Sequence, residues 1–179
     1  ADTIVNVVDA AHLDRDLFLT LQIIDMGFPV VVALNLMDEA RANGLEIDVE
    51  RLSAELGVEV IPTIAVRGEG IAELKAAIGR ARRGIPTPEV AARLPVDLPP
   101  ADGVMWLEDD SATCERLRRP APGLREEIYR ARRRRADEIA ERVIRESSSG
   151  ASLSTRLGRL TLHPLGGLVL LAGFLLLMY

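Results

Sequence analysis

The chain has 179 residues, which leaves room for one domain and a small second one. Hydrophobic residues make up 48% of it but aromatic residues only 3%, so we expect a core of Val, Leu, Ile and Ala. The formal net charge of −5 argues against nonspecific nucleic-acid binding by the whole chain, and a single cysteine, Cys114, excludes an internal disulfide.

The first elements are a strand and a helix. Residues 3–9, TIVNVVD, form an apolar run that ends in the polar Asp9, which is typical of a strand. Residues 10–26 follow as a predicted helix, because Leu13, Leu17 and Leu21 recur at a spacing of four and so share one helical face. Gly27 ends this helix.

The stretch PVVVALNLMD, residues 29–38, predicts a buried parallel strand over residues 30–34. In open α/β sheets, ligands bind beyond the carboxyl ends of the strands, where Asn35 and Asp38 lie. A carboxylate at that end can accept two hydrogen bonds from the ring N–H and the exocyclic amine of guanine, a donor pair that adenine lacks. The alternative is structural: Asp38 caps a short helix and Asn35 closes a turn.

The next elements repeat the alternation of strand and helix. We predict a helix over residues 48–56 that ends at Gly57, a strand over 58–61, and a helix over 70–78. This order predicts an α/β fold with a three-stranded parallel sheet and right-handed crossovers. Because three strands make a thin sheet with an exposed apolar edge, we expect further strands upstream of Ala1.

The loop after the third strand is the predicted neighbour of the Asn35–Asp38 corner. The small side chain of Ala65 lets the backbone approach a flat base, and its N–H could donate to the guanine carbonyl. The alternative is an ordinary strand–helix loop that binds nothing. Taken together, the two corners predict a guanine site made of Asn35, Leu36, Met37, Asp38, Thr63, Ile64 and Ala65.

The chemistry of phosphate binding is absent from these 179 residues. No G-x-x-x-x-G-K-[ST] motif occurs to cradle a phosphate and hold Mg²⁺. We therefore expect a base pocket without a triphosphate pocket, no catalytic residues, and no GTP hydrolysis by this chain alone. The two histidines, His12 and His163, are too far apart in sequence to indicate a metal site.

Residues 83–100 are rich in Gly and Pro and are predicted to be a linker. A helical region is expected over 101–150, with a long helix over 124–146. Within that helix, the run Arg132–Arg135 predicts a solvated face. The alternative for this run is contact with anionic lipid headgroups.

The last fifteen residues, 165–179, read LGGLVLLAGFLLLMY and carry no charge. We interpret residues 151–179 as a juxtamembrane segment and a truncated membrane helix. Arg156 and Arg159 precede the apolar run, which predicts that residues 1–155 lie on the cytoplasmic side. The alternative is a helix buried in a protein core.

Four segments carry a family resemblance: residues 6–22, the stretch VVALNLMDEA at 31–40, GEGIAEL at 68–74 and LHPLGG at 162–167. They resemble the FeoB family, bacterial ferrous iron transporters in which a cytosolic GTPase domain is fused to a membrane domain. The stretch at 31–40 is close to that family's guanine motif, in which the usual lysine is replaced by an apolar residue, here Leu36. Ile64, by contrast, departs from the serine commonly found at its position.

The resemblance implies that residues 1–82 are the C-terminal half of a G domain, residues 101–150 a helical coupling domain, and residues 151–179 the start of the first membrane helix. It implies GTP-dependent Fe²⁺ uptake across the bacterial inner membrane, with GTP or GDP as the cofactor and the Mg²⁺ site lying elsewhere. It assigns guanine specificity to Asn35 and Asp38 and a second base loop to Thr63–Ala65. The implied partners are the lipid bilayer, the rest of the transporter chain and a small cytosolic accessory protein. The competing hypothesis is a membrane-anchored scaffold or interaction module that binds no nucleotide.

Overall fold

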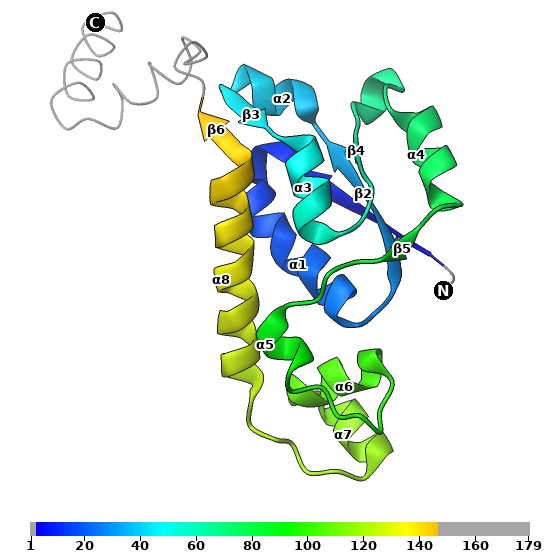
Figure 1. The fold of residues 1–179 in the computed structure, drawn as a ribbon, viewed down its shortest axis with the longest axis vertical. Helices are drawn as coiled ribbons and strands as arrows, with labels where there is room; N and C mark the ends of the chain where they lie inside the picture. Colours follow the sequence, from blue (N-terminus) through cyan, green and yellow to red (C-terminus); the bar gives the residue numbers. More distant parts are fainter. Residues whose placement is uncertain (1–2, 147–179) are drawn as a thin grey trace, which may run out of the picture.

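The computed structural model describes residues 3–146 and shows a sheet flanked by helices, with a smaller helical region at one end (Figure 1). Its parallel part has the strand order β1 (Ile4–Asp9), β2 (Pro29–Asn35) and β4 (Val60–Pro62). β2 pairs in parallel with both neighbours, which confirms the predicted α/β fold and its parallel strands.

The sheet contains one strand that the sequence did not predict. β5 (Arg82–Arg83) pairs antiparallel with the start of β2, so the sheet is mixed and the expectation of three parallel strands alone was wrong. Two consecutive arginines show no alternation of apolar and polar residues that would predict a strand. They form one here because their backbone pairs with the start of β2. The side chain of Arg82 also donates from Nε to the carbonyl of Gly57 at 3.0 Å.

Helices cover both faces of the sheet. α1 (Leu13–Asp25) and α3 (Val49–Leu56) pack on one face and α4 (Ile71–Ile78) on the other (Figure 1). Successive side chains of a strand point to opposite faces, so β2 is buried on both sides. This double burial explains why β2 reads as a continuous apolar run. The predicted helix over residues 10–26 is split, because a 3₁₀ turn at Ala10–His12 precedes α1.

The helical region consists of α5 (Pro88–Ala91), α6 (Pro100–Leu107), α7 (Ser111–Leu117) and the first half of α8 (Arg125–Val143). A small apolar core holds it together, made of Val90, Val104, Leu107 and Ile128. The second half of α8 belongs to the larger core under the sheet through Ala136, Ile139, Ala140 and Val143.

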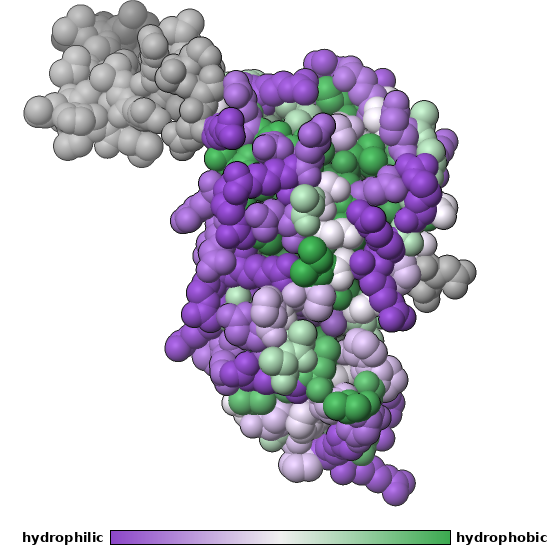
Figure 2. Space-filling model, viewed as in Figure 1, coloured by the Kyte–Doolittle hydropathy of each residue, from purple (hydrophilic) through white to green (hydrophobic). Residues whose placement is uncertain are grey.

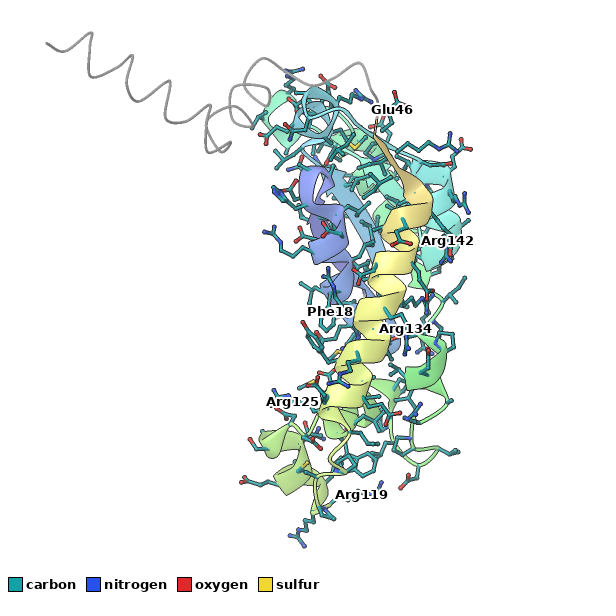
Figure 3. All side chains as sticks on the ribbon, turned by 90° about the vertical axis from the view of Figure 1, so that its left-hand side faces the viewer. Phe18, Glu46, Arg119, Arg125, Arg134 and Arg142 are labelled. Carbon is teal, nitrogen blue, oxygen red and sulfur yellow. The ribbon has the colours of Figure 1, made fainter. Side chains whose placement is uncertain are left out.

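α8 runs along one side of the described molecule and joins the helical region to the α/β part (Figure 3). Residues 83–100, the predicted linker, contain α5 and contribute buried side chains. The boundaries between the predicted domains stay a prediction. The face drawn in Figure 2 is mixed, with hydrophilic side chains around apolar ones that lie at its centre and over the helical region.

A second, two-stranded sheet ties the end of α8 to the α/β part. The long helix predicted over residues 124–146 ends at Val143, and β6 (Ile144–Glu146) continues it as a strand. β6 pairs antiparallel with β3 (Leu45–Ile47), which follows α2 (Met37–Ala42). The amide of Asp48 also donates to the carbonyl of Val143 at 2.9 Å. This β3–β6 ribbon was not predicted, because its strands are short and about a hundred residues apart in the chain.

The predicted membrane segment, residues 151–179, lies outside the described residues. Among the helices of residues 3–146, none is both long and apolar enough to cross a bilayer.

Candidate functional site

The site predicted from the sequence lies at the carboxyl edge of the parallel strands. Asp9, the last residue of β1, is in register with Asn35, the last residue of β2. Leu34 is in register with Pro62, so the loop that begins at Thr63 leaves β4 directly beside Asn35. Parallel strands bring their carboxyl ends to one edge, and the two predicted corners therefore meet.

Asn35 joins the two corners. Its Oδ1 accepts hydrogen bonds from Thr63 Oγ1 at 3.2 Å and from the backbone N–H of Ala65 at 3.0 Å. The amide of Thr63 donates to the carbonyl of Leu34 at 2.8 Å, which fixes the start of the loop. The Ala65 N–H is therefore already engaged, and the sequence-based expectation that it donates to a base carbonyl does not describe this structure.

The turn from β2 into α2 has an unusual backbone. Leu36 adopts a left-handed conformation with φ of 61°, which costs about 1–2 kcal/mol for a residue with a Cβ. Met37 follows as a buried residue, and its amide lies 3.5 Å from the carbonyl of Thr63. Strained residues of this kind gather at functional sites, so the outlier supports a role for this corner.

Asp38 is the second residue of α2, so it lies in the first turn of the helix and is not its capping residue. The capping position is Leu36, whose side chain makes no cap hydrogen bond. Asp38 Oδ1 accepts from the amide of Glu39 at 3.1 Å, and Oδ2 lies 3.4 Å from Nη2 of Arg67 in the neighbouring loop. The Asp38 side chain is 30% exposed, so its carboxylate is open to solvent beside Arg67.

The loop after β4 is tightly folded. Ile64, which stands where the resemblance leads one to expect serine, is buried, and its amide donates to the carbonyl of Glu69 at 3.1 Å. A cavity of about 380 Å³ lies under this loop, lined by Met37, Arg41, Ile61, Pro62, Thr63, Ile64, Glu69, Gly70 and Glu73. Met37, Thr63 and Ile64 of the predicted site line this cavity, whereas Asp38 and Ala65 do not, so the cavity adjoins the predicted corner but does not include its carboxylate.

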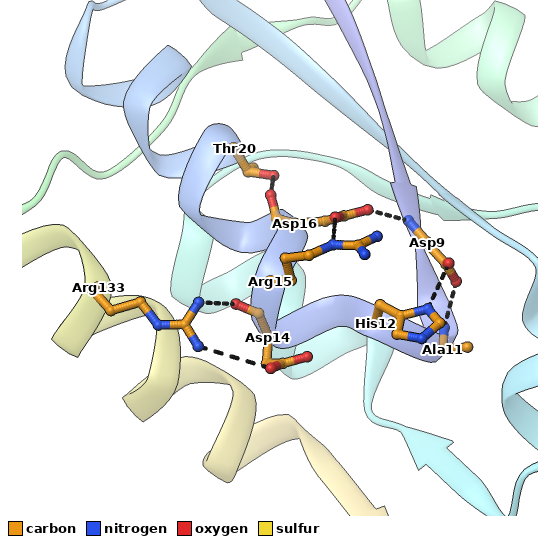
Figure 4. A network of polar contacts seen from close by, with 8 residues as sticks. All are labelled: Asp9, Ala11, His12, Asp14, Arg15, Asp16, Thr20 and Arg133. Carbon is orange, nitrogen blue, oxygen red and sulfur yellow. Dashed lines mark hydrogen bonds and ion pairs between the residues drawn. The ribbon is translucent and has the colours of Figure 1, made fainter. Parts of the chain in front are cut away.

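Asp9 holds the turn from β1 into α1 (Figure 4). Its Oδ1 accepts from the amide of Ala11 at 2.8 Å, and its Oδ2 lies 2.8 Å from Nδ1 of His12. Burial alone would raise the pKa of Asp9, but the bonds from His12 and Ala11 outweigh it and the pKa is lowered. Both oxygens are thus used within the turn, and Asp16 anchors the Asp9 amide at 3.0 Å.

The arginine run on α8 departs from the predicted solvated face. Arg132 is only 1% exposed: Nε donates to Asp25 Oδ2 at 3.0 Å, and Nη1 lies 2.8 Å from Glu108 Oε1 without hydrogen-bond alignment. Arg135 donates to the carbonyl of Ile85 at 2.9 Å, and burial lowers its pKa. The prediction was therefore wrong for Arg132, because its helix face lies against α1 rather than solvent.

Comparisons with known proteins find one family. Residues 1–78 match the family model described as ferrous iron transport protein B. The Fe(2+) transporter FeoB of Escherichia coli K12 is 50% identical over 80 residues, which are 45% of this chain and 10% of that protein. The same figures hold for its Salmonella typhimurium relative, so the match spans about a tenth of the length of these proteins.

Solved structures extend the similarity beyond residue 78. The cytosolic domain of L. pneumophila FeoB matches with a TM-score of 0.66 and 28% identity over 81% of this chain and 68% of that one. A GDP-bound mutant of S. thermophilus NFeoB matches with a TM-score of 0.63 and 26% identity over 81% and 70% of the two chains.

The chain matches the FeoB family over residues 1–78. Its described residues are a FeoB-type G-domain region followed by the helices that pack against it. The FeoB match was predictable from the motifs at residues 6–40 and 68–74. The buried Arg132 and the β3–β6 ribbon were not, since no sequence motif marks either of them.

Proposed function

We propose that this FeoB-family chain supplies the guanine-recognition corner of a GTP-dependent Fe²⁺ transporter. The observation that carries the proposal is the pair of hydrogen bonds from Thr63 and Ala65 to Asn35 Oδ1, which hold two chain segments 28 and 30 residues apart as one corner beside Asp38. The names of the matched relatives support the transport role, and the GDP-bound neighbour supports the ligand.

The recognition chemistry follows from the residue types. The carboxylate of Asp38 accepts hydrogen bonds from the ring N–H and the exocyclic amine of guanine. The backbone around Leu36 and Met37 lies alongside the base, and Thr63, Ile64 and Ala65 close the other side of the corner. Asn35 acts indirectly by positioning that loop, because its Oδ1 is already engaged there.

The second half of the proposal is that this region couples the nucleotide site to the membrane. α2 starts at the guanine corner and leads within a few residues into β3, which pairs with β6 at the end of α8. Figure 3 shows Glu46 of β3 beside β6, the strand that continues from α8. A path of consecutive and paired elements therefore connects Asp38 to β6, which precedes the predicted membrane segment at 151–179.

The remaining features of the proposal rest on the relatives. The protein works in the bacterial inner membrane with residues 1–155 on the cytoplasmic side, and the phosphate groups and Mg²⁺ are held by segments other than these 179 residues. The lipid bilayer, the rest of the transporter and a small cytosolic accessory protein are its partners. The competing hypothesis remains a membrane-anchored scaffold in which Asn35 and Asp38 have only structural roles.

The test is a change of base specificity in the full-length protein. Asp38→Asn replaces an acceptor oxygen by a donor amide, so guanine loses a charge-assisted hydrogen bond and xanthine, which carries a carbonyl in place of the amine, gains a partner. We expect GDP affinity to fall about ten- to a hundredfold and xanthosine diphosphate affinity to rise, measured by isothermal titration calorimetry.

Glu39→Gln is the matched control, because it neutralises the adjacent exposed carboxylate on α2 and should leave both affinities unchanged. Equal affinities of the Asp38→Asn and wild-type proteins for the two nucleotides would favour the scaffold hypothesis.

A further inference from the structure

The specificity carboxylate has a partner of its own within the chain. Nη2 of Arg67 lies 3.4 Å from Oδ2 of Asp38, and the amide of Glu39 occupies Oδ1. Within residues 3–146, Arg67 is the one cation in an ion pair with Asp38. Before a base arrives, Oδ1 therefore accepts one amide, and Oδ2 faces the Arg67 guanidinium at ion-pair distance without an aligned hydrogen bond.

The chemistry of Arg67 makes this pairing significant. A guanidinium presents parallel N–H donors to a carboxylate, and guanine presents its ring N–H and exocyclic amine in the same side-by-side arrangement. We propose that Arg67 is an intramolecular competitor of guanine that occupies Asp38 in the empty site and weakens nucleotide binding. The proposal rests on the guanine-binding role argued above and adds a residue that sets its affinity.

The surroundings of Arg67 allow it to leave when a base binds. Its side chain is 60% exposed, and it ends the 3₁₀ turn Ala65–Arg67, whose middle residue, Val66, is 87% exposed. The next residue, Gly68, also lies in open space, because a Cβ built on it would meet nothing within 4 Å. The start of the same turn is fixed, because Ala65 is bonded to Asn35. Arg67 can therefore swing out while the base loop keeps its shape.

The exposure of the pair limits the size of the effect. Solvent-exposed ion pairs are worth up to about 1 kcal/mol, which corresponds to a change of up to about fivefold in affinity. Arg67→Gln should therefore tighten GDP binding by about two- to fivefold in the full-length protein. Because affinity changes at one site appear mostly in dissociation, the release of a fluorescent GDP analogue should slow by a similar factor.

The chain offers a closely matched control. Arg80 forms an exposed ion pair with Glu59 at 2.8 Å, and its side chain is 60% exposed, as in Arg67, with a partner that is 28% exposed. Arg80→Gln removes the same charge from the same G-domain region but leaves Asp38 paired. Arg80→Gln should leave GDP affinity and release unchanged. A general effect of the lost charge would instead change GDP binding in both variants.

A double-mutant cycle with Asp38→Asn completes the test. Without the carboxylate, Arg67 has nothing to occupy, so Arg67→Gln should not change the affinity of the Asp38→Asn protein for xanthosine diphosphate. If Asp38→Asn switches the base but Arg67→Gln leaves GDP binding unchanged or weaker, the proposed competition by Arg67 is refuted and the guanine assignment stands. If Asp38→Asn fails to switch the base, the guanine assignment fails, and the role of Arg67 falls with it.

Discussion

The buried arginine on α8 offers the sharpest test of how the two parts of the molecule are held together. Arg132 contacts Asp25 of α1 and Glu108 after α6, and its guanidinium lies 5.2 Å from the ring centroid of Phe18. Asp25 also accepts from the amide and the hydroxyl of Thr87. One buried charge cluster thus joins α1, the segment before α5, the end of α6 and α8.

The perturbation is Arg132→Met, which replaces arginine by an unbranched apolar side chain and so removes the charge. The side chains of Arg132 and Asp25 are 1% and 0% exposed, so the substitution leaves a fully buried carboxylate without its cation. Breaking a buried pair in this way costs about 3–5 kcal/mol, a large part of the roughly 5–15 kcal/mol that stabilises a typical domain.

The assay is equilibrium urea unfolding of this chain, followed by the fluorescence of Trp106, its single tryptophan. Arg133→Met is the control, because Arg133 is 38% exposed and its loss should cost less than about 1 kcal/mol. Adding Asp25→Asn to Arg132→Met should recover part of the loss, since no unpaired charge is then buried. Equal costs for Arg132→Met and Arg133→Met would refute the reasoning.

Two further predictions concern the guanine corner and its link to the membrane. Gly70→Ala should impair guanine-nucleotide binding strongly, because Gly70 has a φ of +76° and a Cβ there would lie 2.2 Å from the carbonyl oxygen of Pro62. Gly68→Ala is the control: Gly68 has a φ of +72° but open space around it, so the substitution should cost only about 1–2 kcal/mol of backbone strain and keep binding. GDP titrations of both variants test this, and equal losses of affinity would contradict it. Ile144→Asp, which puts a charge opposite Ile47 in the β3–β6 ribbon, should reduce GTP-dependent Fe²⁺ uptake into proteoliposomes but leave GDP affinity unchanged. Full uptake by this variant would show that the ribbon does not carry the coupling.

The sequence by itself determined the elements whose pattern is local. β2 is buried on both faces, so it appears as an unbroken apolar run, and α1 repeats leucines at the helical spacing. Because parallel strands end at a common edge, the two strand-end loops could be placed side by side before any coordinates. The structure brings Asn35 and Thr63 together as that reasoning required.

Only the tertiary structure decided which polar groups pair and which short segments become strands. Arg132 lies on the buried stripe of α8, but the sequence does not identify its partner, Asp25, which is 107 residues away. Arg133, the next residue, lies at the surface. β5 and β6 likewise form only because the folded chain places them beside β2 and β3, with which they pair. Propensity and periodicity report on neighbours within a few residues, whereas these pairings depend on how the whole chain folds back on itself.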